Sequence, residues 1–105
     1  MNSLDQKVYD LMGLGSKQAK NSKWFNQAIG ISRRDLCQSV YNLRNLGIPI
    51  GADRSRGGGY YIMVEEEDKR RTIAQMKSQA YEMLKTAGRM ENSLIDGCEQ
   101  LELGS

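Results

Sequence analysis

Side chains that can read nucleic-acid bases stand at helical spacing near the middle of the chain. At about 100° per residue, Arg34, Gln38 and Tyr41 point away from the apolar stripe of a helix, with Asn42 on the flank. Arginine, glutamine and asparagine can make paired hydrogen bonds to guanine or adenine edges. Arg33, nearer the apolar stripe at the helix start, is placed for a phosphate contact. This face predicts binding to duplex DNA; the alternative is a polar surface without a partner.

A second cationic stretch, DRSRGGGYYI over residues 53–62, follows that helix. Glycine loses more backbone freedom on ordering than any other residue, so three in a row indicate a tight turn or a close backbone approach. The stretch lacks the lysine and the following helix of a nucleotide-binding phosphate loop. We expect a hairpin whose arginines, Arg54 and Arg56, contact the DNA backbone.

The composition argues against an enzyme. The chain has no histidine, which removes the commonest general base and a common metal ligand. Its two cysteines, Cys37 and Cys98, are too few for a disulfide framework and are expected to be reduced thiols. The sequence also contains no paired-carboxylate motif and no nucleophile motif that could replace histidine or cysteine in catalysis. We therefore expect a protein without catalytic activity, metal site or cofactor.

Charge is divided unevenly along the chain. Residues 1–64 carry nine Lys and Arg against four Asp and Glu, whereas residues 65–105 carry six against nine. This division predicts a basic domain over residues 1–64 and a C-terminal helix over residues 65–105 with a separate task. No apolar run approaches the ~20 residues of a membrane span, and the N-terminus lacks a signal sequence. A cytoplasmic protein without membrane contact is expected.

Apolar spacing and turn residues predict the elements that position these side chains. Ser32 is expected to cap the third helix, and Gly30 and Gly47 to end the second and third helices. Residues 13–21 are expected to form a loop. The expected helices span residues 3–12, 22–30, 31–47 and 65–97, and the expected strands residues 48–52 and 60–64.

Aromatic residues are assigned to faces by the same periodicity. Alternation along a strand places Tyr60 inward and Tyr61 outward. On the second helix Phe25 belongs to the buried stripe. The neighbouring Trp24 is expected to pack against the C-terminal helix, with an exposed contact as the alternative.

The C-terminal helix carries an apolar stripe that steps by three and four residues, as the a and d positions of heptads do. The flanking e and g positions form a poor set for charge-specified pairing, and Met-rich faces are adaptable partner surfaces. Homodimerisation is favoured; folding back onto the domain and binding another protein remain open. The residues proposed for the contact are Ile73, Met76, Ala80, Met83, Leu84, Ala87 and Met90.

A spaced pattern of residues runs through the third expected helix and the hairpin: Ser32-Arg33, Leu36, Val40, Leu43-Arg44, Gly47-Ile48-Pro49-Ile50 and Gly59-Tyr60-Tyr61-Ile62. By this pattern the chain resembles, over residues 4–64, the winged-helix domain of the biotin-repressor type. The first helix and residues 13–21 match this pattern poorly, whereas the second and third helices and the hairpin match it specifically. The resemblance implies that the third helix enters the major groove and that the hairpin, the wing, follows the DNA backbone.

The expected fold is mainly α with a small β-hairpin, a winged helix-turn-helix followed by a long C-terminal helix. The expected function is sequence-specific binding of double-stranded DNA by a homodimer, as in a bacterial or phage transcriptional regulator. Since fold does not fix function, the alternative is a protein-interaction module that binds or inhibits a nucleic-acid-processing machine. No ligase or ligand-binding domain follows the winged helix, so biotin chemistry is not expected.

Overall fold

The computed structural model describes residues 1–55 and 58–104, with side chains described as far as residue 92. The chain forms two compact units, Met1–Arg70 and Arg71–Ser105. The first extends slightly beyond the boundary predicted at residue 64. Along the chain the elements are α1 (Ser3–Leu11), the short 3₁₀ helix η1 (Ser16–Gln18), α2 (Ser22–Ile29), α3 (Arg33–Asn45), β1 (Ile50–Ala52), β2 (Tyr60–Ile62) and α4 (Glu66–Gly104).

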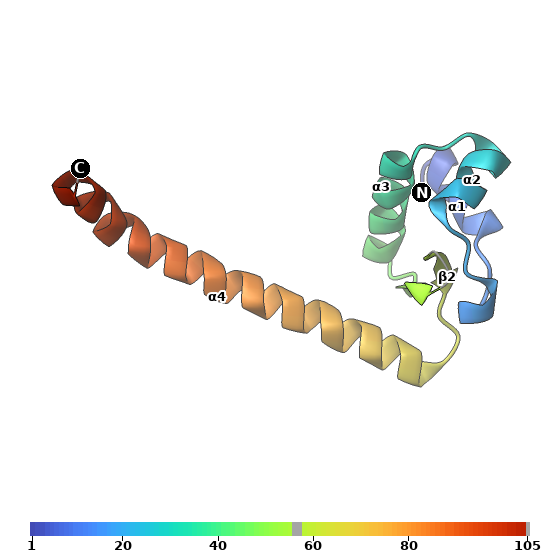
Figure 1. The fold of residues 1–105 in the computed structure, drawn as a ribbon. Helices are drawn as coiled ribbons and strands as arrows, with labels where there is room; N and C mark the ends of the chain where they lie inside the picture. The colour runs from blue at the N-terminus through green and yellow to red at the C-terminus, as the bar shows by residue number, and fades with distance from the viewer. Residues whose placement is uncertain (56–57, 105) are drawn as a thin grey trace. The chain divides into compact units, whose positions relative to one another are not determined.

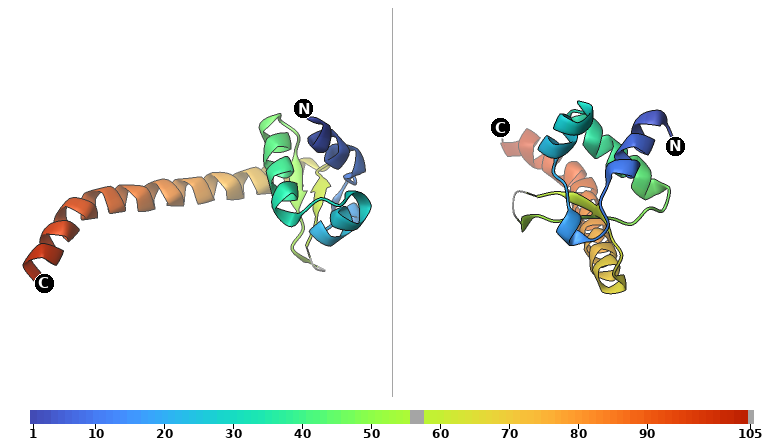
Figure 2. Two further views of the ribbon diagram at one scale, coloured as in Figure 1. Left: turned by 90° about the horizontal axis from the view of Figure 1, so that it is seen from above. Right: turned by 90° about the vertical axis from the view of Figure 1, so that its right-hand side faces the viewer.

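The predicted fold class is confirmed: the chain is mainly helical, with an antiparallel hairpin and a long C-terminal helix in a winged-helix-like arrangement. In Figure 1 and the right-hand view of Figure 2, α1, α2 and α3 gather together with the hairpin beneath them. None of the helices in the described part of the chain is both long enough and apolar enough to cross a membrane.

Side-chain caps fix where the short helices begin. Ser32 accepts a hydrogen bond from the backbone N–H of Asp35 at 3.1 Å, so its predicted capping role is confirmed. The first two helices are capped by Asn2 and Asn21, whose side chains accept hydrogen bonds from the backbone N–H groups of Asp5 and Trp24. Gly30 ends α2 in the left-handed region at φ 69°, where glycine avoids a Cβ clash.

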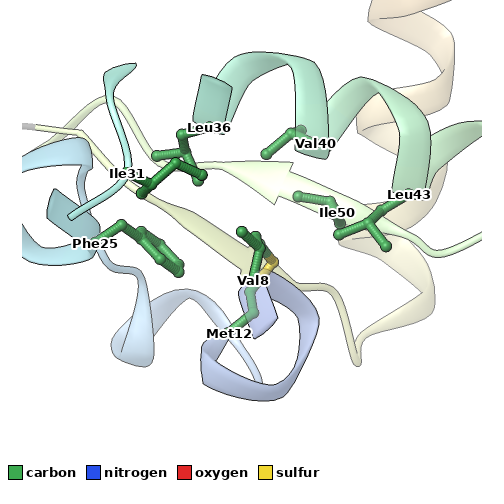
Figure 3. Packing of buried hydrophobic residues seen from close by; sticks show 8 residues of the cluster. All are labelled: Val8, Met12, Phe25, Ile31, Leu36, Val40, Leu43 and Ile50. Atoms are coloured by element: carbon green, nitrogen blue, oxygen red, sulfur yellow. The ribbon is translucent and has the colours of Figure 1, made fainter. Parts of the chain in front are cut away.

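One apolar core joins the three short helices to the hairpin (Figure 3). Phe25 of α2 and Leu36 and Leu43 of α3 are fully buried, and each such burial contributes about 1.5–3 kcal/mol. Ile50 brings β1 into the same cluster. The predicted α3 stripe is therefore the face that holds α3 on the domain. The buried cluster is Val8, Met12, Phe25, Ile31, Leu36, Val40, Leu43 and Ile50.

The hairpin gains backbone partners from the segment before α2. β1 and β2 pair in antiparallel register with Gly51 opposite Tyr61. On the other side of β2, Ile62 accepts from the N–H of Gly15 at 2.8 Å, and Tyr60 and Lys20 exchange two hydrogen bonds of 3.0 Å each. The expected loop at residues 13–21 thus covers the free edge of β2, which ties the hairpin to the helices.

The expectation that Tyr61 faces outward is wrong. Tyr61 is only 5 % exposed, and its hydroxyl donates a 2.6 Å hydrogen bond to Asp68 at the start of α4. The ring lies over Gly51, where an added Cβ would stand 2.7 Å from Tyr61 Cζ. Tyr60, on the opposite face, is half-buried against the core. Both faces of the hairpin are covered, because the chain after β2 turns back over the outer face.

Trp24 packs within its own domain. Its ring meets Phe25 edge to face with centroids 5.1 Å apart, and it joins the rim of the core. Lys20 Nζ lies 4.3 Å from the Trp24 ring centroid and donates to the carbonyl of Leu11 at 2.7 Å. The contacts of the Lys20 side chain therefore hold residues 13–21 against α1 and α2.

Candidate nucleic-acid interface

The outward side of α3 carries the polar side chains singled out from the sequence. Arg33, Arg34 and Gln38 are exposed, and Tyr41 is 62 % exposed. The opposite side of α3 buries Leu36, Val40 and Leu43, so the helix cannot rotate without exposing the core. These four polar residues are therefore held on the surface by the packing beneath them.

Among the described arginines of residues 1–64, Arg44 has a structural contact and three others are available for binding. Arg44 Nε donates to the carbonyl of Ile50 at 3.0 Å and joins the end of α3 to β1. Arg33, Arg34 and Arg54 have no hydrogen-bond or ion-pair partner among the described residues. A guanidinium is always charged and presents five donors, so each of the three is ready to bind an anion.

A cleft of about 450 Å³ lies where α2, α3 and the wing meet; the wing here means the described residues 53–55 and 58–59, between β1 and β2. It brings Arg33 of α3 and Arg54 of the wing to one surface hollow, although they stand far apart in the sequence. The cleft is lined by Asn21, Ser22, Arg33, Leu36, Cys37, Ala52, Asp53, Arg54, Gly58, Gly59 and Tyr60.

The side chains of Cys37 and Tyr60 meet in this cleft. Cys37 is exposed, and its Sγ lies 3.6 Å from the hydroxyl oxygen of Tyr60. Burial raises the pKa of Tyr60, and the contact with Cys37 adds to the effect. The Tyr60 phenol therefore stays uncharged near neutral pH. The charged groups that line the cleft are the guanidinium groups of Arg33 and Arg54 and the carboxylate of Asp53, so positive charge predominates.

Asn42 is occupied by contacts within the domain. Its amide nitrogen donates to Asp5 Oδ2 at 3.2 Å, and its amide oxygen accepts from Gln38 Nε2 at 2.9 Å. Asp5 is only 4 % exposed, so Asn42 supplies a donor to a buried carboxylate. The bond fastens α3 to α1. The hydrogen bond from Gln38 to Asn42 also orients the Gln38 side chain on the exposed face of α3.

The wing owes its shape to hydrogen bonds and to glycine. Asp53 accepts from both the backbone N–H and the hydroxyl of Ser55, at 2.9 and 2.6 Å. Gly58 has φ 82°, and a Cβ on Gly59 would stand 3.0 Å from the backbone nitrogen of Lys20. These glycines serve a turn and a close approach to the segment before α2. The predicted contact Arg56 lies outside the described residues.

Sequence reasoning missed the cleft and its neutral lining. Asn21 and Ser22 reach it from the start of α2, and no periodicity within one element predicts that meeting. Cys37 stands four residues after Arg33 on the same helix, so the two share a side of α3. That spacing is the one signal that could have placed Cys37 beside the cationic surface.

No cluster of three or more metal-binding side chains occurs within the residues that the structure describes. No family model, curated protein or solved structure matches the chain.

Proposed function

We propose that the chain is a sequence-specific double-stranded DNA-binding protein that acts in the cytoplasm as a transcriptional regulator of bacterial or phage origin. α3 enters the major groove, and the wing follows the sugar–phosphate backbone, as the resemblance to the biotin-repressor type of winged helix implies. Arg34, Gln38 and Tyr41 contact base edges. Arg33 and Arg54 contact phosphates.

The observation that carries the proposal is the convergence on one exposed surface of three arginines that have no partner among the described residues. Arg33 and Arg54 line the cleft, and Arg34 lies beside Arg33 on the exposed side of α3. Arginines that have no acidic partner and lie near a cleft favour binding to a polyanion such as DNA. Each contact with a phosphate releases condensed counterions from the DNA, and this release drives binding. An exposed helix with arginine and glutamine side chains favours base reading in the major groove.

A duplex titration across salt tests the proposal. A labelled pool of random duplexes is titrated with the full chain at several salt concentrations, followed by selection of the bound fraction. We expect the logarithm of the binding constant to fall linearly with the logarithm of salt, by about 0.9 per phosphate contacted. Selection should enrich a defined sequence. Absence of binding at low salt, or binding that does not respond to salt, would contradict DNA binding.

The exposed apolar side chains of α4 favour a second candidate function, a protein-interaction module. Met83 and Leu84 are 72 % and 71 % exposed, and exposed apolar surface of this kind is typical of protein-binding sites. In this function the chain would bind or inhibit a nucleic-acid-processing machine. Recovery of one protein in stoichiometric amount, together with failure of the duplex titration, would favour this function over DNA binding.

A further inference from the structure

The apolar stripe of α4 is exposed along its described length. Ile73 and Met76 are 40 % and 48 % exposed, and Met83 and Met90 further along the helix are 72 % and 59 % exposed. We propose that this stripe pairs with the same stripe of a second copy, with the two α4 helices antiparallel. The inference concerns residues 73–92 and does not depend on the proposed DNA binding.

The alternation of small and large residues selects the orientation. Ala80 and Ala87 occupy a positions, and Met83 and Met90 occupy d positions. In a parallel pair identical positions face each other, so thin Ala–Ala layers would alternate with bulky Met–Met layers. Reversal of one helix places each a position opposite a d position, so every such layer holds one alanine and one methionine. Facing a large residue with a small one fills a helix interface evenly.

The residues beside the stripe agree with the same orientation. In an antiparallel pair e positions face e positions, and here the e positions are Lys77, Leu84 and Glu91. Leu84 is equally distant from the other two in sequence. When Leu84 faces Leu84 of the second copy, each Lys77 therefore faces a Glu91. A parallel pair would instead place Lys77 beside Thr72 and Leu84 beside Gln79, so neither charge would gain a partner.

Neither charge has an oppositely charged residue at ion-pair spacing on its own helix. Residues three and four positions away from Lys77 and from Glu91 carry no opposite charge. Ion pairs within a helix form at those spacings. On the outer side, by contrast, Lys85 pairs with Glu82 at 3.5 Å and lies over the ring of Tyr81. The Lys85–Glu82 pair is thus made within one helix, whereas Lys77 and Glu91 beside the stripe can find an opposite charge only on a second copy.

This arrangement fixes a register that can be tested. With Leu84 facing its copy, Met83 of one chain forms a layer with Ala87 of the other. Two Met83 residues, or two Ala87 residues, are then offset by four residues along the axis, about 6 Å. A parallel pair would bring the identical residues together instead.

Disulfide formation between engineered cysteines distinguishes the two orientations. Full-length chains carry Cys37→Ser and Cys98→Ser, with either Met83→Cys or Ala87→Cys, and one of the two variants bears a size tag. Under mild oxidation we expect the mixture to yield the mixed disulfide and each variant alone to yield little product. Faster self-linking of either single variant than mixed linking would overturn the antiparallel pair. A monomeric wild-type chain at tens of micromolar in sedimentation would overturn pairing altogether.

Charge reversal gives a readout that does not depend on introduced cysteines. Lys77→Glu should raise the dimer dissociation constant on the order of tenfold, because two symmetry-related pairs are lost and two repulsions appear. Adding Glu91→Lys should return it close to the wild-type value. Arg89→Glu, on the outer side, is the matched control and should leave dimerisation unchanged. Failure of the double variant to restore affinity would contradict the pairing of Lys77 with Glu91.

Discussion

Polar residues on and around α3 divide into those that hold the domain together and those that remain available. Asn42 and Arg44 donate to Asp5 and to the carbonyl of Ile50. Arg33 and Arg34 stand on the same helix without a partner in the described part of the chain. Substitution at the first group should therefore change stability, and substitution at the second should change binding.

Arg34 and Arg54 should differ in how they affect DNA recognition. Arg34→Ala is expected to reduce discrimination between a selected duplex and a random one by about 1–3 kcal/mol, because a base contact is lost. Arg54→Ala should weaken binding to both duplexes equally and reduce the salt slope by about 1, because a phosphate contact is lost. Fluorescence anisotropy across salt measures both quantities.

The control for these variants is Arg89→Ala on α4, which removes the same charge from an exposed arginine. Its binding should match that of the wild-type chain. Equal losses of affinity for all three variants would indicate a response to net charge and would contradict the assigned roles.

Asn42 should matter chiefly for stability. Asn42→Ala removes the donor to the buried carboxylate of Asp5, and an unsatisfied buried polar group costs about 1–3 kcal/mol. Urea denaturation should show that loss in the free energy of unfolding. Asn45→Ala changes an exposed asparagine on the same helix and should stay within about 0.5 kcal/mol of the wild type. If both variants proved equally stable, the Asp5–Asn42 hydrogen bond would not contribute to the free energy of unfolding.

At the scale of elements, local signals predicted α3 and its cap, although the helix runs from Arg33 to Asn45 within the expected residues 31–47. Ser32 caps α3 and Gly30 ends α2, because capping depends on residues adjacent in sequence. The α3 stripe also follows from periodicity alone. Residues 13–21 were expected as a loop, yet Lys20 bonds to Tyr60 through the backbone. Backbone pairing of this kind leaves little trace in side-chain types, so a single sequence does not reveal it.

The error at Tyr61 has a tertiary cause. Alternation predicts opposite faces for Tyr60 and Tyr61 correctly, but it does not say what covers the second face. The first turn of α4 supplies Asp68 to the Tyr61 hydroxyl, and Gly51 leaves room for the ring. The cleft was unpredictable for the same reason, since three elements build it. Its arginines could be named from the sequence, whereas their convergence required the fold.

The hairpin should be sensitive to a methyl group at Gly51. An added Cβ would lie 2.7 Å from Tyr61 Cζ and 2.9 Å from Met63 Cγ, and both side chains are buried. Gly51→Ala is therefore expected to destabilise the protein by about 1–3 kcal/mol through overpacking. Thermal or urea unfolding of the first unit measures the effect.

Gly88→Ala is the matched control, because a Cβ at Gly88 meets no atom within 4 Å. Alanine is favoured over glycine in a helix by about 0.8–1 kcal/mol, so helical content should hold or rise. A Gly51→Ala protein as stable as the wild type would mean that Tyr61 does not close over the strand as the structure has it.

At the scale of the whole molecule, the chain pairs a basic compact unit with a long helix of opposite net charge. The first unit presents the arginine surface of α3 and the wing, and the second presents an apolar stripe. If α4 joins two copies and the arginine surface binds DNA as proposed, each complex carries two such surfaces, and binding of the second becomes intramolecular. Recognition and self-association then reside in separate parts of one short chain.

The central claim is that duplex DNA covers the surface between α3 and the wing, and the thiol of Cys37 reports on that surface directly. In a Cys98→Ser protein Cys37 is the only thiol, exposed and lining the cleft beside Arg33 and Arg54. Its alkylation rate is measured with and without a duplex whose binding is followed by anisotropy. The account predicts that alkylation slows in proportion to the fraction of protein bound. A duplex that binds fully while Cys37 reacts at the free rate would contradict it.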